Sequence, residues 1–427
     1  MATTDKVLLC KYVPYTLIFA KDDETLTMDP SNILSIEKVD DYEYNLRSIL
    51  KISLRMDIRK KLWLLKNKRS IMCKFELDII GQNSEADSYV TNNESVINGE
   101  FSIYFNDQDE SIDTVAMEQG ISGNGNSNEE STSNISTESY FDSENIIDVY
   151  LMNSKLLNAS MKMCNRIYSS GTLQQFVGEI LTSSKHKNVL MSRFENFNQY
   201  KEMIVPSLPA YKALIYLDQY YGFYKTGALI YYDIDKLYIL NTNGKSSTIC
   251  KKEYPETTFM IRETSNCTPG NGMVRKQQES VYYINIPETN FSPQQTSIAK
   301  NAELGSEAKI VVTDDTTIDI EDADQTYMDQ RNQYIKYIKK DDNQFTASIL
   351  KARMEENDCI AYLTGDNFDM RAFTPNKIFQ LIFDDTAKQN KYGKHKYRLV
   401  YAYHYIKLQS QSTMTSTHRI ILKRVCN

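Results

Sequence analysis

Histidine offers this sequence its widest range of chemistry, because its side chain titrates near neutral pH and binds metals. The chain of 427 residues has four: His186, His395, His404 and His418. None stands at an i, i+4 spacing with Glu, and none accompanies a Ser or Cys in a known nucleophile motif. A catalytic triad would need partners that the fold brings together. We therefore interpret all four as surface or strand histidines and predict no catalytic residue.

Carboxylates gather in one acidic run that could hold Ca²⁺, a cation that takes about six to eight oxygen ligands. The run consists of Asp314, Asp315, Asp319, Glu321, Asp322 and Asp324. It lacks the D-x-D-x-D-G register and the closing Glu of a calcium loop, so the solvated rim of a β-hairpin is the better interpretation. Asp233 and Asp235 are likewise interpreted as turn residues. The sequence predicts neither a metal nor a cofactor.

Positive charge is dense in only one segment, which surrounds the single tryptophan, Trp63. The members of this basic cluster are Arg55, Arg59, Lys60, Lys61, Lys66, Lys68 and Arg69. Three interpretations stay open: phosphate contacts that would make binding depend on salt, a patch that binds a partner protein, and a solvated face. The formal net charge of −7 argues against a dedicated nucleic-acid-binding protein, which should carry a basic excess.

The cysteines and the apolar segments indicate the cellular compartment in which the chain folds. The cysteines are scattered, odd in number and never spaced as C-x-x-C, which favours reduced thiols in a cytoplasm over disulfides or a zinc site. The first residues lack the basic start and long apolar core of a signal peptide. No run approaches the roughly 18 apolar residues of a membrane span, so we expect no such span.

The elements that would position these side chains fall into three ordered regions. Residues 1–105 are predicted to be mostly β, since apolar and polar residues alternate over 50–56 and 71–77. Between these two stretches, residues 57–69 form a short helix or a wide turn. Residues 106–145, rich in Asn, Ser, Thr and Glu, are typical of a flexible linker or loop. A central αβ region covers 146–250, and a second β-rich domain covers 251–427.

The central region contains the most clearly patterned stretch, residues 195–241. Apolar residues recur at helical spacing over 210–221, and Gly222 follows where a C-terminal cap is expected. Residues 227–232 and 236–240 then predict two strands, joined by a turn that contains Asp233 and Asp235. A second helix is predicted over 173–181, with Thr172 as its N-cap.

Four features of this stretch occur together: Pro206 before the helix, Leu217-Asp218 near its end, Tyr221-Gly222-Phe223-Tyr224 after it, and a hairpin of the form D-x-D-x-LYIL over 233–240. This combination resembles the central region of tail-hub, or baseplate-hub, proteins of contractile-tailed bacteriophages. Phe-Thr-Pro-Asn-Lys at 373–377 and Tyr-Arg-Leu at 397–399 resemble the C-terminal β region of such hubs. The resemblance is strongest over 196–240.

The resemblance implies an α+β, mostly β fold in which two tube-like β-barrel domains flank or interleave with a small αβ region. It also implies a structural virion protein that forms a trimer, joins the tail tube to the central spike, contacts other baseplate proteins and lets DNA pass transiently. Such a protein would be made in the host cytoplasm and reside in the tail. Some hubs cleave peptidoglycan, but no segment here has the required acid and base signature, so no enzymatic activity is inferred.

A protein of this kind works through interfaces, where aromatic residues supply much of the binding energy. The sequence has 30 tyrosines, and the candidate anchors are Trp63, Tyr231, Tyr232 and Tyr238. Two alternatives stay open. One is a viral or bacterial enzyme with an unrecognised His or carboxylate site, and the other is a nucleic-acid-binding factor that uses the basic cluster at 55–69.

Overall fold

A large β-sheet dominates the computed structural model. The structure describes residues 6–42, 45–68, 70–83, 89–105, 144–224, 227–241, 258–263, 273–275, 282–286, 289–292, 308–313, 327–328, 334–339, 360–375, 377–408 and 414–424. In these ranges, fifteen strands form the sheet. They are β1 (Lys6–Lys21), β2 (Glu24–Met28), β3 (Ile33–Asp41), β4 (Ile49–Asp57), β5 (Met72–Asn83), β6 (Tyr89–Tyr104), β7 (Glu144–Asn153), β13 (Thr258–Glu263), β14 (Met273–Arg275), β15 (Tyr282–Ile286), β16 (Thr289–Ser292), β20 (Ile360–Asp366), β21 (Ile378–Phe383), β22 (Lys396–Leu408) and β23 (Met414–Arg424). The prediction of a mostly β chain is confirmed.

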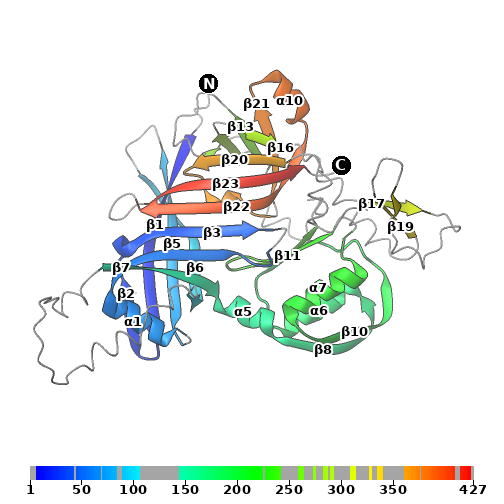
Figure 1. Ribbon diagram of the computed structural model, residues 1–427, viewed down its shortest axis with the longest axis horizontal. Helices are drawn as coiled ribbons and strands as arrows, with labels where there is room; N and C mark the ends of the chain where they lie inside the picture. The colour runs from blue at the N-terminus through cyan, green and yellow to red at the C-terminus, as the bar shows by residue number, and fades with distance from the viewer. Residues whose placement is uncertain are drawn as a thin grey trace, which may run out of the picture.

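The strand order joins the two ends of the chain. It runs β14-β15-β13-β21-β22-β3-β4-β7-β6-β5-β1-β23-β20-β16, with β2 beside β1, and β14–β1 and β22–β23 form further pairs. The C-terminal β22 therefore lies beside the N-terminal β3, with Tyr405 opposite Glu37 (Figure 1). The two β-rich ends share one sheet.

Two hydrophobic clusters lie along this sheet, and the long strands β22 and β23 contribute to both. Ile406 and Met414, where these two strands meet, belong to the cluster formed mainly by residues 12–151. Leu399 and Leu422, near the other end of the same strands, belong to the cluster formed mainly by residues 261–422. Each of these strands thus passes from one core to the other.

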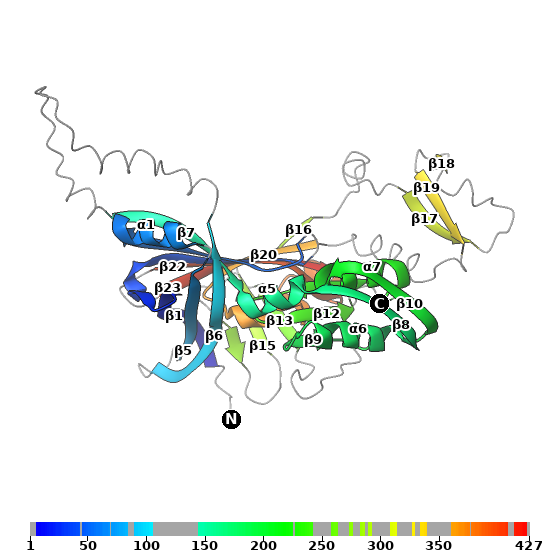
Figure 2. The same ribbon diagram turned by 90° about the horizontal axis from the view of Figure 1, so that it is seen from below.

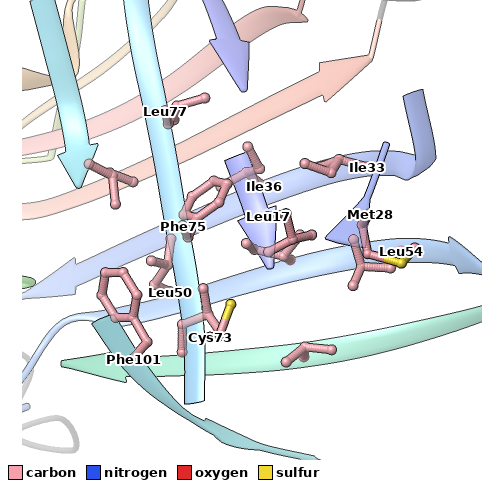
Figure 3. Packing of buried hydrophobic residues seen from close by; sticks show 14 of the residues in the cluster. Leu17, Met28, Ile33, Ile36, Leu50, Leu54, Cys73, Phe75, Leu77 and Phe101 are labelled. Atoms are coloured by element: carbon pink, nitrogen blue, oxygen red, sulfur yellow. The ribbon is translucent and has the colours of Figure 1, made fainter. Parts of the chain in front are cut away.

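The first core shows why the alternating residues form strands. On β4, Leu50, Ile52 and Leu54 are buried, whereas Lys51 and Arg55 point away from the core, as the sequence pattern predicted. Figure 3 shows Leu50 and Leu54 among side chains from β1, β3 and β5. Removing such apolar side chains from water is the main favourable term in folding.

A smaller central unit continues from β7 and lies to one side of the large sheet (Figures 1 and 2). Its elements are α5 (Ser154–Met161), β8 (Met163–Thr172), α6 (Leu173–Ser183), β9 (Val189–Met191), β10 (Gln199–Pro209), α7 (Ala210–Tyr221), β11 (Ala228–Tyr232) and β12 (Leu237–Asn241). β8 and β10 form a two-stranded ribbon, and β11, β12 and β9 form a second small sheet. The unit has a hydrophobic core of its own.

The predicted helix and hairpin of residues 210–240 are confirmed. α7 buries Ala213, Leu214 and Leu217. It ends at Gly222, whose φ of 68° lies in the left-handed region that glycine adopts without steric cost. β11 and β12 then pair antiparallel, with Tyr231 opposite Tyr238.

The N-terminus of α6 is also as predicted, because Thr172 caps it. The backbone N–H of Thr172 donates to Gln175 Oε1 at 2.8 Å, and the backbone N–H of Gln175 donates to Thr172 Oγ1 at 3.4 Å. Two donors that the helix leaves without partners are thereby satisfied.

Thr172→Ala is expected to lower the free energy of unfolding by about 1 kcal/mol, the usual cost of losing an N-cap side chain. Urea unfolding of the purified chain measures it. Thr182→Ala in the same helix is the matched control, since the Thr182 hydroxyl only donates back to Gly178 O and should matter less. An equal loss in both variants would contradict the capping role.

The remaining described elements are α1 (Ile58–Asn67), α10 (Thr386–Lys391), the short 3₁₀ helices Pro30–Asn32 and Met370–Ala372, and a small sheet of β17 (Ala308–Thr313), β18 (Tyr327–Met328) and β19 (Tyr334–Lys339). α1 shows that residues 58–67, within the stretch 57–69, form a helix and not a wide turn.

Residues 106–143 of the predicted linker and the whole acidic run of 314–324 lie outside the described residues. Among the helices described, none combines the length and apolar character of a membrane span.

Candidate functional site

The three tyrosines predicted as interface anchors lie between the central unit and the large sheet. Tyr231, Tyr232 and Tyr238 are at most 4 % exposed. The ring of Tyr231 packs edge to face on Tyr42 at a centroid distance of 4.5 Å, and its hydroxyl donates to Asp40 Oδ1 at 2.9 Å. These contacts are made within one chain. A contact of these tyrosines with a second protein stays a prediction.

A buried group of charges lies at the same place. The Lys38 ammonium on β3 pairs with Asp40 and, at 3.0 Å, with Asp233 Oδ1. Asp40 is fully buried and Lys38 almost so. Burial alone would lower the pKa of Lys38, but Asp233 and Asp40 together raise it above its ordinary value. We name Lys38, Asp40, Tyr42, Tyr231 and Asp233 the junction cluster.

The junction cluster holds the hairpin of the central unit on β3. Asp233 forms the turn between β11 and β12, and its backbone N–H donates to Lys236 O at 2.8 Å. The interpretation of Asp233 as a turn residue is thus correct, but the ion pair with Lys38 was not foreseen. Backbone bonds reinforce the contact, since Tyr232 N–H donates to Leu46 O and Ser48 N–H donates to Tyr232 O, both at 2.8 Å.

Trp63 lies on α1, outside the junction cluster. Its ring is partly buried against the first core, and its Nε1–H donates to Glu24 Oε2 at 2.9 Å. Of the four proposed anchors it alone keeps part of its ring at the surface. A role at a contact with another protein stays a prediction for Trp63.

The basic cluster is divided by the faces of α1 and β4. Lys61 is buried, and its ammonium donates to Ile146 O at 3.4 Å. Lys60 pairs with Asp57, the N-cap of α1, at 3.1 Å. The exposed members are Arg55, Arg59 and Lys66, Lys68 is half-buried, and Arg69 lies outside the described residues. The cluster is therefore less concentrated at the surface than its sequence indicates.

Two of the four histidines contact each other in the core, although the sequence analysis predicted no contact between them. His404 on β22 and His418 on β23 are cross-strand neighbours, both fully buried, with Nδ1 atoms 2.6 Å apart. The backbone N–H of Phe368 donates to His418 Nε2 at 3.2 Å. His418 therefore carries its proton on Nδ1 and donates it to His404 Nδ1. His404 is then protonated on Nε2, which lacks a hydrogen-bond partner within the described part of the chain.

Burial keeps this pair neutral. It lowers the pKa of both imidazoles well below the ordinary value, and Lys38, the cross-strand neighbour of His404 on β3, lowers that of His404 further. His186 is half-buried, with Nδ1 2.6 Å from Ser184 Oγ and Nε2 3.2 Å from Tyr232 OH. Its burial lowers its pKa to about 4. His395 is half-buried.

The buried polar side chains of these arrangements bond to one another and to the backbone of the same chain. The cavity beside the junction cluster, lined by Arg47, Ser48 and Asp233 among others, has a volume of about 30 Å³, which is room for water. Over the described ranges, no three His, Cys, Asp or Glu side chains gather in a way that could hold a metal ion. Sequence periodicity could show that Lys38, His404 and His418 point inward, but not that they meet.

Comparison with known proteins finds solved structures to which the chain is similar. They include a tail protein from Neisseria meningitidis MC58 (9 % identity, TM-score 0.46, 96 % of each chain). They also include the 43 kDa tail protein of prophage MuSo2 from Shewanella oneidensis (9 % identity, TM-score 0.44, 95 % of this chain and 96 % of that one). A third is an E. coli type VI secretion component described as similar to bacteriophage T4 tail proteins (9 % identity, TM-score 0.38, 94 % and 76 %). No curated protein matches the sequence.

A family model gives the assignment. The family described as the bacteriophage PBS1 gene 109 protein matches residues 51–425, which is most of the chain. The sequence-based recognition of a bacteriophage tail relative is thereby confirmed. The chain belongs to the bacteriophage PBS1 gene 109 protein family.

Proposed function

We propose that this protein is a structural component of a phage tail, a tail hub or baseplate protein that joins the tail tube to the central spike. The observation that carries the proposal is the family match over residues 51–425. In this role the chain resides in the virion, forms a trimer, contacts tube, spike and baseplate proteins, and lets DNA pass transiently. Protein interfaces, not an active site, perform its function.

The strand pairings support the two tube-like domains that this role implies. One circuit of pairs runs from β22 through β3, β4, β7, β6, β5, β1 and β23 back to β22. A second runs from β22 through β21, β13, β15, β14, β1 and β23 back to β22. The two main hydrophobic clusters divide between these circuits. A sheet closed on itself is a barrel without free edges, and we propose that each circuit is such a domain.

The division of the chain into domains along the sequence is coarser than these circuits, because β7, β22 and β23 take part in the first circuit and β1 takes part in both. We propose an N-terminal β domain over 1–105, a linker over 106–145, a central αβ unit over 146–250 and a C-terminal β domain over 251–427. Lys38 and Asp233 tie the central unit to the first of these domains. The tie fixes the position of the central unit's hairpin on β3. The histidines that an enzyme would use support the structural role, because His404 and His418 lie in the core, away from any substrate.

The mass of the purified chain in solution, alone and with candidate tube and spike proteins, tests the proposal. Light scattering is expected to give about three times the 49.4 kDa of one chain, or a monomer that forms a defined ring when tube and spike proteins are added. A chain that stays monomeric and indifferent to those partners would refute the hub role.

A further inference from the structure

A groove lies between β8 and α6, at the outer rim of the central unit (Figure 1). Its lining includes residues 166–170 of β8 and one side of α6, with Gln175, Gly178, Glu179 and Thr182 among its members. Successive residues of a strand point to opposite faces, so a space that five of them line in a row lies along the strand's edge. The groove has a volume of about 730 Å³, within the roughly 300–1,000 Å³ of ligand sites. We name it the β8 groove.

The edge of β8 along this groove has no neighbouring strand among the residues that the structure describes. There β8 pairs with β10 alone, from Thr172 opposite Gln199 to Met163 opposite Pro209. β10 contributes none of the described residues that line the groove, so the groove follows the opposite edge of β8. On such an edge, every second residue points its backbone N–H and C=O away from the sheet. This regular row of donors and acceptors matches the backbone of another extended chain.

Contacts between β8 and α6 form the floor of the groove. The buried rings of Tyr168 and Phe176 pack at a centroid distance of 5.0 Å. Gly171 lies so close to Phe176 that a Cβ added there would be 2.8 Å from the ring. Further along, the Arg166 guanidinium reaches Glu179 at 3.4 Å. The strand and the helix are therefore in place before a ligand enters, which lowers the cost of ordering on binding.

Gly178 leaves room on the helical side of the groove. A glycine inside a helix costs stability relative to alanine. A Cβ added at Gly178 would nevertheless meet no described atom within 4 Å apart from its chain neighbours and the helix's own backbone. Gln175 and Thr182 stand three residues before and four residues after it, so they flank this space on the same side of α6. A side chain of a ligand can occupy the space that Gly178 leaves open.

The side chains around the groove indicate an uncharged ligand. The charged members of its lining, Arg166 and Glu179, pair with each other, and its other members are hydroxyl, amide or apolar residues. On the face of β8 opposite Tyr168, Ile167 is 64 % exposed and stands across from Ile204 of β10, which is 55 % exposed. A strand added to the edge of β8 would place a third side chain in this row, where β-branched residues pack well.

We propose that the β8 groove binds an extended, uncharged segment of a partner protein, which adds to β8 as a third strand beside α6. Backbone hydrogen bonds to the edge of β8 supply the affinity. A β-branched side chain beside Ile167 and a side chain in the space beside Gly178 supply the specificity. The site goes beyond the hub role, because it concerns a peptide ligand of the central unit and not the assembly of the large sheet with tube and spike.

Fluorescence anisotropy of the full chain with a labelled peptide, TVTITVT, tests the proposal. The peptide is uncharged, and in a strand it places Val and Ile on one face and Thr on the other. Gly178→Trp fills the open space and is expected to weaken binding about tenfold or more. Gly178→Ala is the matched control, because its single methyl group has room and should leave binding unchanged. Circular dichroism establishes that both variants are folded.

Two modified peptides test the strand pairing on the unaltered protein. One carries N-methyl groups on its odd-numbered residues and the other on its even-numbered residues, so each loses the backbone donors of one edge only. The peptide methylated on the edge toward β8 should bind about tenfold more weakly or worse, because several hydrogen bonds are lost. The other peptide should keep the affinity of TVTITVT.

The outcomes separate this inference from the proposed function. Binding that Gly178→Trp weakens, that Gly178→Ala keeps and that distinguishes the two methylated peptides supports the β8 groove. A wild-type chain that does not bind TVTITVT at concentrations up to about 1 mM overturns the inference. Equal binding by Gly178→Trp and the wild type, or equal behaviour of the two methylated peptides, overturns it as well. The hub role stands or falls separately, on the mass of the chain alone and with tube and spike proteins.

Discussion

Lys38→Met is expected to lower the free energy of unfolding by about 3–5 kcal/mol, because it leaves buried carboxylates without their cation. Asp40 has no exposed surface and Asp233 very little. Met matches the length of the Lys stem, so packing changes little and the loss reports the charge. Urea unfolding at pH 7 measures the change, with its slope checked to ensure that the transition stays cooperative.

Lys51→Met is the matched control for Lys38→Met. Lys51 lies on the neighbouring strand β4 and also has two acidic partners, Glu37 at 2.6 Å and Asp148 at 3.5 Å. The side chains of Lys51 and Glu37 are 20 % and 21 % exposed and that of Asp148 is 36 % exposed, however, and pairs that water reaches are worth about 0–1 kcal/mol. A loss for Lys38→Met no larger than that for Lys51→Met would contradict the role of the junction cluster.

Removing all the charges of the junction cluster at once separates its electrostatics from its packing. Lys38→Met/Asp40→Asn/Asp233→Asn leaves no uncompensated ion, and neutral replacement of a buried ion group often costs little. The triple variant is therefore expected to be more stable than Lys38→Met alone. If it is less stable, hydrogen bonds such as that from Tyr231 to Asp40 contribute more than the balance of charge.

The elements of the central unit could be predicted because their signals are local. The helix of 210–221, its end at Gly222 and the Asp-containing turn at 233–235 each depend on residues within a few positions of one another. The strands of the large sheet were equally visible as alternation, which identifies the inward side chains of a strand. These patterns gave the fold class and the order of the elements along the chain.

The junction cluster and the histidine pair could not be predicted, because alternation says nothing about which strands are neighbours. Lys38 and His404 are opposite each other on β3 and β22, at opposite ends of the sequence. Tyr231 was chosen as an interface anchor, but the structure shows only that its hydroxyl donates to Asp40 of the same chain, and its contact with a second protein stays a prediction. An aromatic residue that anchors an internal contact and one that anchors an interface look the same in a sequence.

Acid sensitivity follows from the neutral histidine pair. In the folded chain, burial holds the pKa of His404 and His418 well below the ordinary value, whereas in the unfolded chain both return to about 6.5. Below that pH the unfolded state binds more protons than the folded state, so stability falls as pH falls. The Lys38 ammonium opposes protonation of His404 in the folded state, and its partners Asp40 and Asp233 offset part of that effect.

The free energy of unfolding is expected to fall between pH 6.5 and pH 5, by at most about 1.4 kcal/mol per pH unit for each of the two histidines, the limit for a group that stays neutral in the folded chain. Urea unfolding across this range measures the loss.

The variant His404→Leu/His418→Phe should flatten the dependence of stability on pH, because neither replacement titrates. An apolar pair also removes the unpartnered Nε2–H of His404. The double variant keeps His186, whose pKa of about 4 leaves a weaker dependence on pH. His395 is half-buried and burial also lowers its pKa, so His395→Gln should flatten the profile less than the double variant does. A double variant as acid-sensitive as the wild type would show that protons act elsewhere, on groups outside the β22–β23 core.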